Sequence, residues 1–392
     1  MSFAKLHSGA SARPQRGLTL VELMISITLG LVVIGGVLYM YLSSKGSYRT
    51  SKSTSRAQEA GRVGLDAVLH DIREAGYIGC GSRESLSTYM PLQINQTAVP
   101  QMSMTDPTQA VFGYSASGYT AGSTNSWAST PVGTSANPQW IATGGDVLVI
   151  RVATSSPVRM VSDSNTTTPA LFVADNCARV STGDYVIASS CTSATILRVS
   201  NVPPLPASPT ACPVPNTGTA ISPGVEIDYA TKDVNGNAVN SSTVTPQAFP
   251  YKSLGSVQTF DEYTYYVGQL TGRPWPALYR LSFRQTQNAS WNGVSEEVVD
   301  HVQSMSVYYG VDPGGGNPIA YYAASAMTPS LWPSVTNIRI QLLTAGDDLG
   351  VATLPQPALA FGAPNTAPSF TPTDTRYWQV FTGVAALRDR LN

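Results

Sequence analysis

The sequence predicts an α+β protein in which one long N-terminal helix packs on an antiparallel, β-rich globular body. Three observations predict this fold. Residues 18–42 form an apolar run with a single formal charge, and a polar stretch with helical periodicity follows to about Ala75. After Cys80, short segments of alternating apolar and polar residues replace that period. The 392 residues are enough for one large β domain or for two domains.

Composition points to an extracytoplasmic body and argues against binding to nucleic acid. Charged residues make up 12% of the chain, about half the usual ~25%, while Gly (33) and Pro (28) are abundant. Residues 1–17 hold three basic and no acidic residues, which leaves 20 basic against 24 acidic residues, a net charge of −4. We expect no nucleic-acid partner, because no basic surface is available to neutralise phosphates.

The apolar run at 18–42 is long enough to cross a membrane, since about 20 apolar residues span the hydrocarbon core as a helix. The basic residues before it predict that this end stays in the cytoplasm. A secretory signal peptide fits poorly: its apolar core has about 7–15 residues, and residues 39–42 offer no small-residue cleavage site. The run therefore predicts a membrane anchor that stays on the chain.

The junction before the run carries a specific motif. A plain signal anchor needs only a basic flank and an apolar run, and it explains neither Glu22 nor Gly17. The segment 16–23, RGLTLVEL, resembles the prepilin leader junction of type IV pilins and type II secretion pseudopilins. That resemblance implies that a prepilin peptidase cleaves after Gly17 and methylates the new N-terminus at Leu18.

Glu22 is the residue that the sequence singles out for assembly. A carboxylate inside a membrane segment costs about 2.5–3.5 kcal/mol on insertion scales. After cleavage, the α-amino group of Leu18 lies four residues before Glu22 on the same helix face. The two charges can neutralise each other within one chain or between subunits, and the resemblance implies the second arrangement. The alternative is an incidental acid that reaches the membrane interface.

Three glycines, Gly30, Gly35 and Gly36, lie in the middle of the apolar run. Small residues allow close packing between membrane helices. Each glycine also lowers helix propensity by ~1 kcal/mol relative to alanine, so this region can extend when the subunit leaves the bilayer. The sequence leaves both interpretations open.

Residues 43–75 become polar but keep a helical period. One narrow stripe of apolar and small residues recurs every three or four positions: Ala57, Gly61, Gly64, Leu65, Val68, Ile72 and Ala75. The charged residues fall mostly off the stripe and are expected to face solvent: Lys45, Lys52, Arg56, Glu59, Arg62, Asp66, Asp71, Arg73 and Glu74. We expect one helix from Leu18 to this point, about 87 Å long, with Gly76 as its C-cap.

Four parts of the chain follow from these observations. We expect a leader at 1–17, a transmembrane and assembly helix at 18–42, an amphipathic helix half at 43–78, and a periplasmic β-rich body at 79–392. A proline-rich stretch leaves open whether the body divides into two lobes near residues 203–220.

The body contains several predicted strands with β-branched and aromatic residues. They cover residues 146–152, 183–191 and 194–199 (a hairpin), 259–268, 277–284, 297–309, 334–343 and 377–387. Asp146 and Asp184 each follow a glycine and open a strand, so we interpret them as turn residues rather than catalytic carboxylates.

Five patches of the body resemble PilW-like minor pilins. They are Gly183-Asp184, YTYYV at 263–267, LYRL at 278–281, VQSMSVYYGVD at 302–312 and VAALR at 384–388. The resemblance is loose across the rest of the body. Together with the leader junction, it implies a pilin-type protein with a long helical spine.

The four cysteines, Cys80, Cys177, Cys191 and Cys212, all follow the membrane segment. An even number in an oxidising compartment predicts two disulfides, although four cysteines allow three pairings. Their spacing is not of the C-x-x-C type, so we expect no zinc site.

No signature of catalysis or of a cofactor is present. The sequence lacks G-x-S-x-G, H-E-x-x-H, P-loop and dinucleotide motifs, and His7, His70 and His301 have no catalytic partners at a recognisable spacing. The turn that begins at Asp312 offers one carboxylate, and residues 233–237 lack the distant glutamate of a calcium loop. We expect no enzyme activity, no metal and no cofactor.

The resemblance implies a minor type IV pilin that primes pilus assembly with other minor pilins and the major pilin, near or at the tip. The chain would sit in the inner membrane before assembly and in the surface pilus afterwards, with roles in adhesion and twitching motility. One alternative is a type II secretion minor pseudopilin, for which a body of about 310 residues is large. Another is a tip adhesin that uses some of the 19 tyrosines and six tryptophans. The sequence identifies neither the partner subunits nor a ligand.

Overall fold

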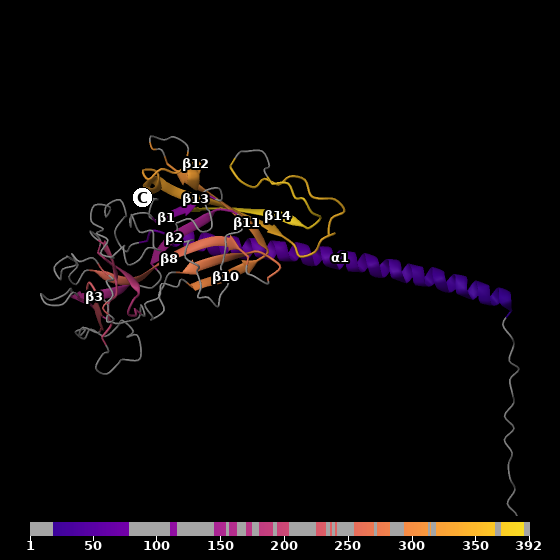
Figure 1. Cartoon of the computed structure of the whole chain (residues 1–392), viewed down its shortest axis with the longest axis horizontal. Coiled ribbons are helices and arrows are strands. Elements are labelled where there is room, and N and C mark those ends of the chain that lie inside the picture. Colours follow the sequence, from indigo (N-terminus) through magenta and orange to yellow (C-terminus); the bar gives the residue numbers. More distant parts are fainter. Residues whose placement is uncertain are drawn as a thin grey trace, which may run out of the picture. The chain divides into compact units, whose positions relative to one another are not determined.

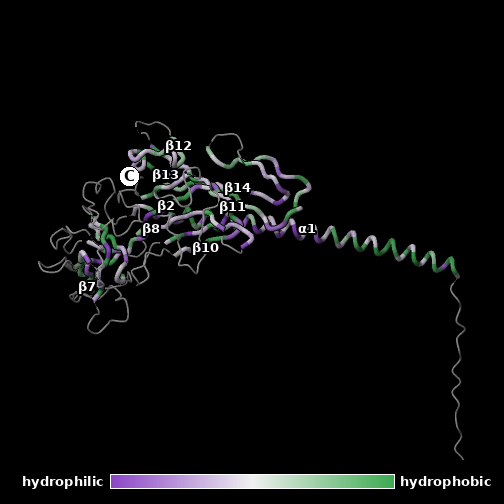
Figure 2. The backbone as a smooth tube through the Cα atoms, viewed as in Figure 1, coloured by the Kyte–Doolittle hydropathy of each residue, from purple (hydrophilic) through white to green (hydrophobic). Residues whose placement is uncertain are grey.

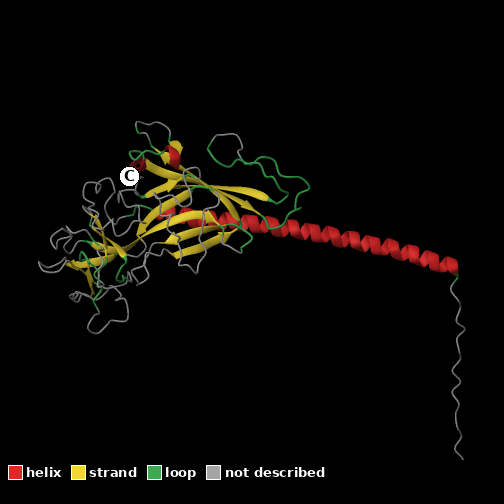
Figure 3. Cartoon of the chain, in the orientation of Figure 1, coloured by secondary structure: helices red, strands yellow, loops and turns green. Residues whose placement is uncertain are grey.

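In a computed structural model, the described part of the chain contains one long helix and two antiparallel sheets (Figures 1 and 3). This arrangement confirms the α+β class. The structure describes residues 19–77, 110–115, 145–153, 157–162, 170–174, 180–190, 194–203, 225–232, 236, 240, 255–269, 273–282, 294–312, 314, 319–364 and 370–387. By its internal contacts the chain divides into two units, residues 1–52 and residues 53–392.

The first unit contains the N-terminal part of α1 (Leu20–Glu74). Its side chains are exposed from Thr19 to Lys52, apart from the half-buried Gly30. In Figure 2 the beginning of this helix is coloured mostly as hydrophobic. The helix is long and apolar enough to cross a membrane, and its apolar part is not buried within the chain.

The larger sheet contains ten of the described strands, and every pairing within it is antiparallel. The strands are β1 (Val111–Tyr114), β2 (Val147–Ala153), β3 (Val158–Ser162), β4 (Ala170–Val173), β5 (Tyr185–Ser189), β6 (Ala194–Arg198), β7 (Val225–Asp228), β8 (Ser256–Gly268), β9 (Ala277–Ser282) and β10 (Val294–Asp300). Strand β8, with 13 residues, is central because it pairs with β2, β3, β5 and β9.

The smaller sheet has four strands in the order β12-β11-β13-β14. They are β11 (Val302–Val311), β12 (Ala320–Ala323), β13 (Val335–Ala345) and β14 (Trp378–Ala386), with short 3₁₀ turns η4 (Ala324–Ala326) and η5 (Trp332–Ser334) between β12 and β13. Alternate residues of its strands, such as Ile338, Ile340 and Leu342, are fully buried. These residues belong to the main core, which also contains Val68 and Ile72 of α1.

Within the second unit, α1 packs one face into the place where the two sheets meet. The small residues of the predicted stripe make this approach possible. A Cβ atom at Gly61 would collide with the ring of Phe381 on β14. A Cβ at Gly64 would lie 3.0 Å from Leu342 of β13 and 3.1 Å from Val299 of β10. The predicted stripe is confirmed.

The helix ends where the sequence predicted. Gly76 has a φ of +78°, a left-handed conformation that favours glycine over residues with a Cβ. Its N–H donates to the carbonyl of Arg151 on β2 at 3.0 Å. The C-cap thus also ties the end of α1 to the larger sheet.

Asp71 was expected to face solvent, and this expectation is wrong. The side chain is buried and accepts a hydrogen bond from the Tyr265 hydroxyl at 2.5 Å. Arg280 reaches the same carboxylate oxygen at 3.4 Å and also binds Glu296 at 3.2 Å. Asp71 lies beside the apolar stripe, and its partners are far away in sequence, so helical periodicity alone assigned it to the polar face.

The segment 297–309 was expected to be one strand, and this expectation is also wrong. The chain breaks at His301, whose φ of +63° is left-handed, and the two resulting strands belong to different sheets. His301 itself is buried, with Trp275 5.4 Å from its ring and carboxylates of Asp300 and Asp347 against its two nitrogens. The residues on both sides of His301 favour strands, so local propensity did not reveal the break between them.

The remaining strand predictions agree with the structure to within a few residues, including the β5–β6 hairpin. Asp184 is a turn residue as expected, since its carboxylate accepts the N–H of Ser181 at 3.0 Å. Asp146 is more than a turn residue. Its carboxylate accepts the N–H of Val307 at 2.8 Å, and its own N–H donates to Met305 at 2.8 Å. Asp146 therefore joins the start of β2 to β11 of the other sheet.

Candidate assembly surfaces

The first turn of α1 is closed by a side-chain cap. The N–H of Glu22 donates to the hydroxyl of Thr19 at 3.2 Å, and the N–H of Leu23 donates to the Thr19 carbonyl at 3.1 Å. Thr19 is therefore the N-cap and Glu22 the third helical residue, the spacing of a capping box. A carboxylate in the first turn also complements the helix dipole. Our sequence reasoning missed this local role, although the T-x-x-E spacing signals it.

Glu22 remains exposed, and no ion pair to it is found within the described part of the chain. Its carboxylate is thus available for a cation outside the described residues. Gly17 and Leu18, which would supply the new amino terminus, lie outside them. Cleavage after Gly17, methylation of Leu18 and pairing of that terminus with Glu22 therefore stay predictions.

The apolar side chains that follow Glu22 form an exposed surface of a size that indicates a membrane or partner-binding region. Val32 and Met40 are each 72% exposed. Nothing outside the helix backbone lies within 4 Å of a Cβ built on Gly30, Gly35 or Gly36. These glycines do not serve packing inside the single chain, which leaves packing against another helix or local extension.

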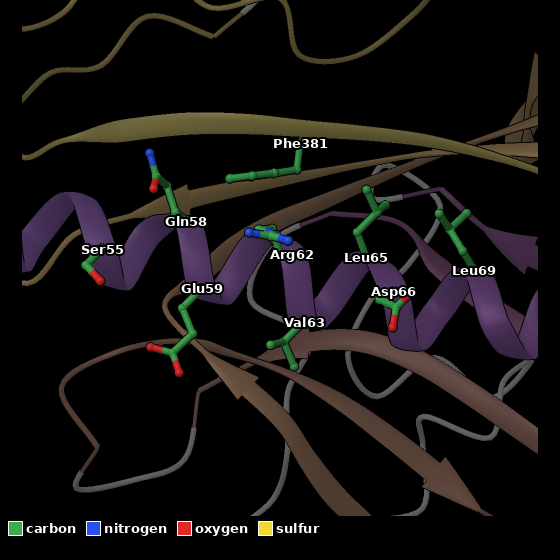
Figure 4. A pocket seen from close by; sticks show the side chains of 9 residues that line it. All are labelled: Ser55, Gln58, Glu59, Arg62, Val63, Leu65, Asp66, Leu69 and Phe381. Atoms are coloured by element: carbon green, nitrogen blue, oxygen red, sulfur yellow. The ribbon is translucent and has the colours of Figure 1, made fainter.

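A groove on the second unit exposes the other face of α1 (Figure 4). It is lined by Ser55, Gln58, Glu59, Arg62, Val63, Leu65, Asp66, Leu69 and Phe381. Figure 4 shows Leu65 and Leu69 on the side of the helix that faces β14, where Phe381 lies, and Val63 on the opposite side. The groove thus has an apolar wall along β14.

The charges in this groove are only weakly compensated. Glu59 lies 3.9 Å from Arg56, an exposed i,i+3 pair that contributes less than about 1 kcal/mol. Arg62 and Asp66 have no ion-pair partner among the described residues. A surface with apolar and unpaired charged side chains next to each other is suited to binding another protein chain.

One buried ion pair lies inside the larger sheet. Arg151 and Glu262, each about 2% exposed, form an ion pair at 2.9 Å between β2 and β8. Burial raises the pKa of Glu262, and the nearby guanidinium opposes that rise. The sequence predicted a strand at 146–152 but did not indicate this pair. Its burial inside the sheet makes it a structural feature rather than a site.

Several predicted site residues cannot be placed. Cys80, Cys177, Cys191 and Cys212 lie outside the described residues, so the disulfides remain predictions.

At the turn after β11, the N–H of Gly314 donates to Asp312 at 2.8 Å. His70 is exposed, 3.7 Å from Glu74. Within the described ranges, no three His, Cys, Asp or Glu side chains gather in a way that could hold a metal.

Comparison with protein families gives two matches. Residues 264–389 match Type IV Pilus-assembly protein W, and residues 12–38 match the prokaryotic N-terminal methylation motif. Over these two segments the chain matches a PilW-like prepilin-type pilin. The first match runs from β8 to the end of β14 and so includes the whole smaller sheet and the β14 wall of the groove. No curated protein and no solved structure matches the chain.

These matches support a pilin-like protein related to type IV pili. A methylation motif implies processing by prepilin peptidase and partners in pilus assembly. The exposed apolar helix and the motif together fit anchoring in the inner membrane. The exposed apolar helix and the groove are therefore candidate docking surfaces.

Proposed function

We propose that this PilW-like protein is a minor pilin that primes assembly of a type IV pilus together with other minor pilins, near or at the filament tip. One observation carries the proposal. Glu22 is the only charged residue in the exposed apolar run up to Leu42, and it lies inside the matched methylation motif. A cation that pairs with this carboxylate would lower the cost of placing it in lipid.

The proposed sequence of events begins in the inner membrane, with the β-rich body in the periplasm. Prepilin peptidase cleaves after Gly17 and methylates Leu18. Glu22 then pairs with the amino terminus of a neighbouring subunit, which lowers the cost of an ion in lipid and favours ordered assembly. The chain finally becomes part of the pilus on the cell surface.

The match to a pilus-assembly family favours this function over that of a secretion pseudopilin. An adhesive role for the body has no specific support in the described residues. The functional proposal therefore concerns assembly, with catalysis assigned to the processing enzyme and not to this chain.

The decisive experiment replaces Glu22 in a strain that lacks the native gene. We expect the Glu22→Ala chain to be cleaved normally. Its amount in sheared pilus fractions should fall at least about tenfold, because the amino terminus of the neighbouring subunit loses its oppositely charged partner. Glu74→Ala is the matched control, since Glu74 is an exposed acid on the same helix that lies outside both the apolar run and the groove. The measurements are the mass of the mature N-terminus and the amount of the chain in pili.

The priming role has its own readout. Deletion of the gene should reduce the number of pili per cell and not their length, and gold-labelled antibody should mark filament ends. Wild-type incorporation of Glu22→Ala, or recovery of chains from pili with residues 1–17 still attached, would contradict the proposal.

A further inference from the structure

The two long edge strands of the sheets, β10 and β14, differ in how well they are protected. The other edge strands are shorter: β1, β7 and β12 have four residues each, and β6 has five. An edge strand exposes backbone donors and acceptors that can pair with another chain, and proteins block such edges with charges and bulges. Edges without these features are therefore candidate binding sites.

Strand β10 carries both kinds of protection. Glu296 and Glu297 are exposed on it, and its pairing with β9 shifts register between Glu297 and Val299. A strand added to this edge would meet two carboxylates and an irregular backbone. The two glutamates and the register shift therefore block this edge against an added strand.

Strand β14 has neither charged side chains nor a register shift. Its nine residues, WQVFTGVAA, include no charge and no proline, and its ladder with β13 continues through nine pairs without a shift. Val384 is 50% exposed. A long, regular, uncharged edge is what an added strand requires.

The outer backbone of β14 is also open. The N–H of Trp378 points away from β13, because it donates to the Gln356 side chain. In an antiparallel strand alternate residues point the same way, so the backbone groups of Val380, Thr382 and Val384 also point outward. None of these groups has a hydrogen-bond partner in the described part of the chain.

Both faces beside this edge carry an arginine without an ion-pair partner among the described residues. On the face toward α1, Arg62 lies in the groove with Phe381 and Leu65. On the other face, Arg339 is opposite Val384 in the ladder, and its buried Nε lacks a hydrogen-bond partner within the described ranges. The edge is thus uncharged and has an arginine beside each face, while the acids of the groove, Glu59 and Asp66, lie on the side of α1 away from Phe381.

We propose that β14 binds an extended segment of another protein as an additional strand. Main-chain hydrogen bonds would form to Val380, Thr382 and Val384. Side chains at alternate positions would enter the apolar wall of Phe381, Leu65 and Leu69, and a carboxylate on the other face would pair with Arg339. Charge complementarity selects an acidic, apolar segment and rejects a basic one.

The test uses the full-length chain in detergent micelles, so it does not depend on pilus assembly. The probe is a synthetic nine-residue peptide of alternating valine and threonine in which one threonine is replaced by glutamate. A matched peptide has lysine at that position. We expect saturable binding by fluorescence anisotropy, at least tenfold weaker for the lysine peptide, and slower hydrogen exchange of the β14 amides on binding.

Val384→Pro is the sharpest variant. Proline removes one outward N–H without removing a bond to β13, so the sheet keeps its ladder while the added strand loses a partner. We expect at least tenfold weaker binding, whereas Val384→Thr, which keeps the N–H, should bind within about twofold of wild type. Arg339→Gln should reduce the preference for glutamate over lysine without changing hydrogen exchange in β13.

Three results would overturn the proposal: no binding of the glutamate peptide, equal binding by Val384→Pro, or binding that leaves exchange of the β14 amides unchanged. Self-association of the full chain that Val384→Pro abolishes would instead identify a second copy as the occupant. A failure of the Glu22 experiment concerns pilus function alone, so the two proposals can fail separately.

Discussion

The two parts of α1 share one backbone conformation and have opposite surroundings. From Thr19 to Lys52 nearly every side chain is exposed, although the sequence up to Leu42 is the most apolar in the chain. From Ser53 to Glu74 the sequence is polar, yet one face is buried against both sheets. The comparison shows that the second part is stabilised by this protein's own core, and the first by a surrounding that the single chain does not supply, namely lipid or neighbouring helices.

The largest expected contrast is between isoleucines in the two parts. Ile72 is fully buried in the core, while Ile34 is 57% exposed. We expect Ile72→Ala to lower the free energy of unfolding of the body by about 2–5 kcal/mol, because it leaves a cavity. Ile34→Ala should change it by less than about 0.5 kcal/mol. Chemical unfolding of the detergent-solubilised chain, followed by tryptophan fluorescence, compares them. Equal effects would remove the distinction between the two parts.

Glycine-to-alanine substitutions provide a second comparison, because they should change stability in opposite directions in the two parts of α1. Gly61→Ala would place a methyl group against Phe381 and should destabilise the body by about 1–3 kcal/mol. Gly35→Ala meets no neighbour and should stabilise the helix by up to ~1 kcal/mol through propensity alone. Circular dichroism during thermal unfolding measures both changes. If Gly35→Ala abolishes pilus incorporation without changing stability, helix packing in the filament would explain that glycine.

The last effect is a change in the free energy of unfolding with pH. It tests how residues 53–74 of α1 are attached to the larger sheet. Burial, followed by the nearby charge of Asp71, raises the pKa of Tyr265. Its unfolded pKa is about 10, so the neutral folded form contributes stability fully below pH 10 and loses it as pH rises toward the higher folded value. We expect unfolding free energy to fall by up to ~1.4 kcal/mol per pH unit above pH 10 from this group, and Tyr265→Phe to remove that part of the slope.

Tyr279 provides a control for this titration: burial raises its pKa to about 12, and its hydroxyl donates to Glu297 of β10. Tyr279→Phe should flatten the stability profile between pH 10 and 12 but leave hydrogen exchange at the C-terminal end of α1 unchanged. Urea titrations at pH 9–12 provide the profile. If Tyr265→Phe left the slope intact, Asp71 would not be the attachment point that the structure indicates.

Local patterns allowed much of the fold to be predicted. The apolar run, the narrow stripe at Gly61 and Gly64, the Gly76 cap and most strands depend on residues close in sequence, so periodicity and turn chemistry reveal them. The junction at Gly17, Leu18 and Glu22 is similarly local, and its motif matches a family.

Other features were not predictable, because their partners are distant in the chain. Asp71 meets Tyr265 and Arg280 across about 200 positions, and Arg151 meets Glu262 across 111. A charged residue in a predicted helix or strand is ordinarily assigned to solvent, since burial without a partner is costly. The turn at His301 was not predicted either. Both flanking segments favour strands, and the break is needed only because the two strands pair with distant residues in different sheets.

By itself, the sequence determined that the chain has an apolar N-terminal helix with one acid in it, a prepilin-type junction and a strand-rich body. Those properties follow from composition and short-range spacing, which act before any distant residues meet. Only the tertiary structure decided that the helix changes from exposed to buried at Ser53, that Asp71 is enclosed, and that β14 is an open edge between two arginines. These depend on which strands pair and which faces the sheets cover, and such pairing is chosen by the summed burial of the whole core and not by any one segment.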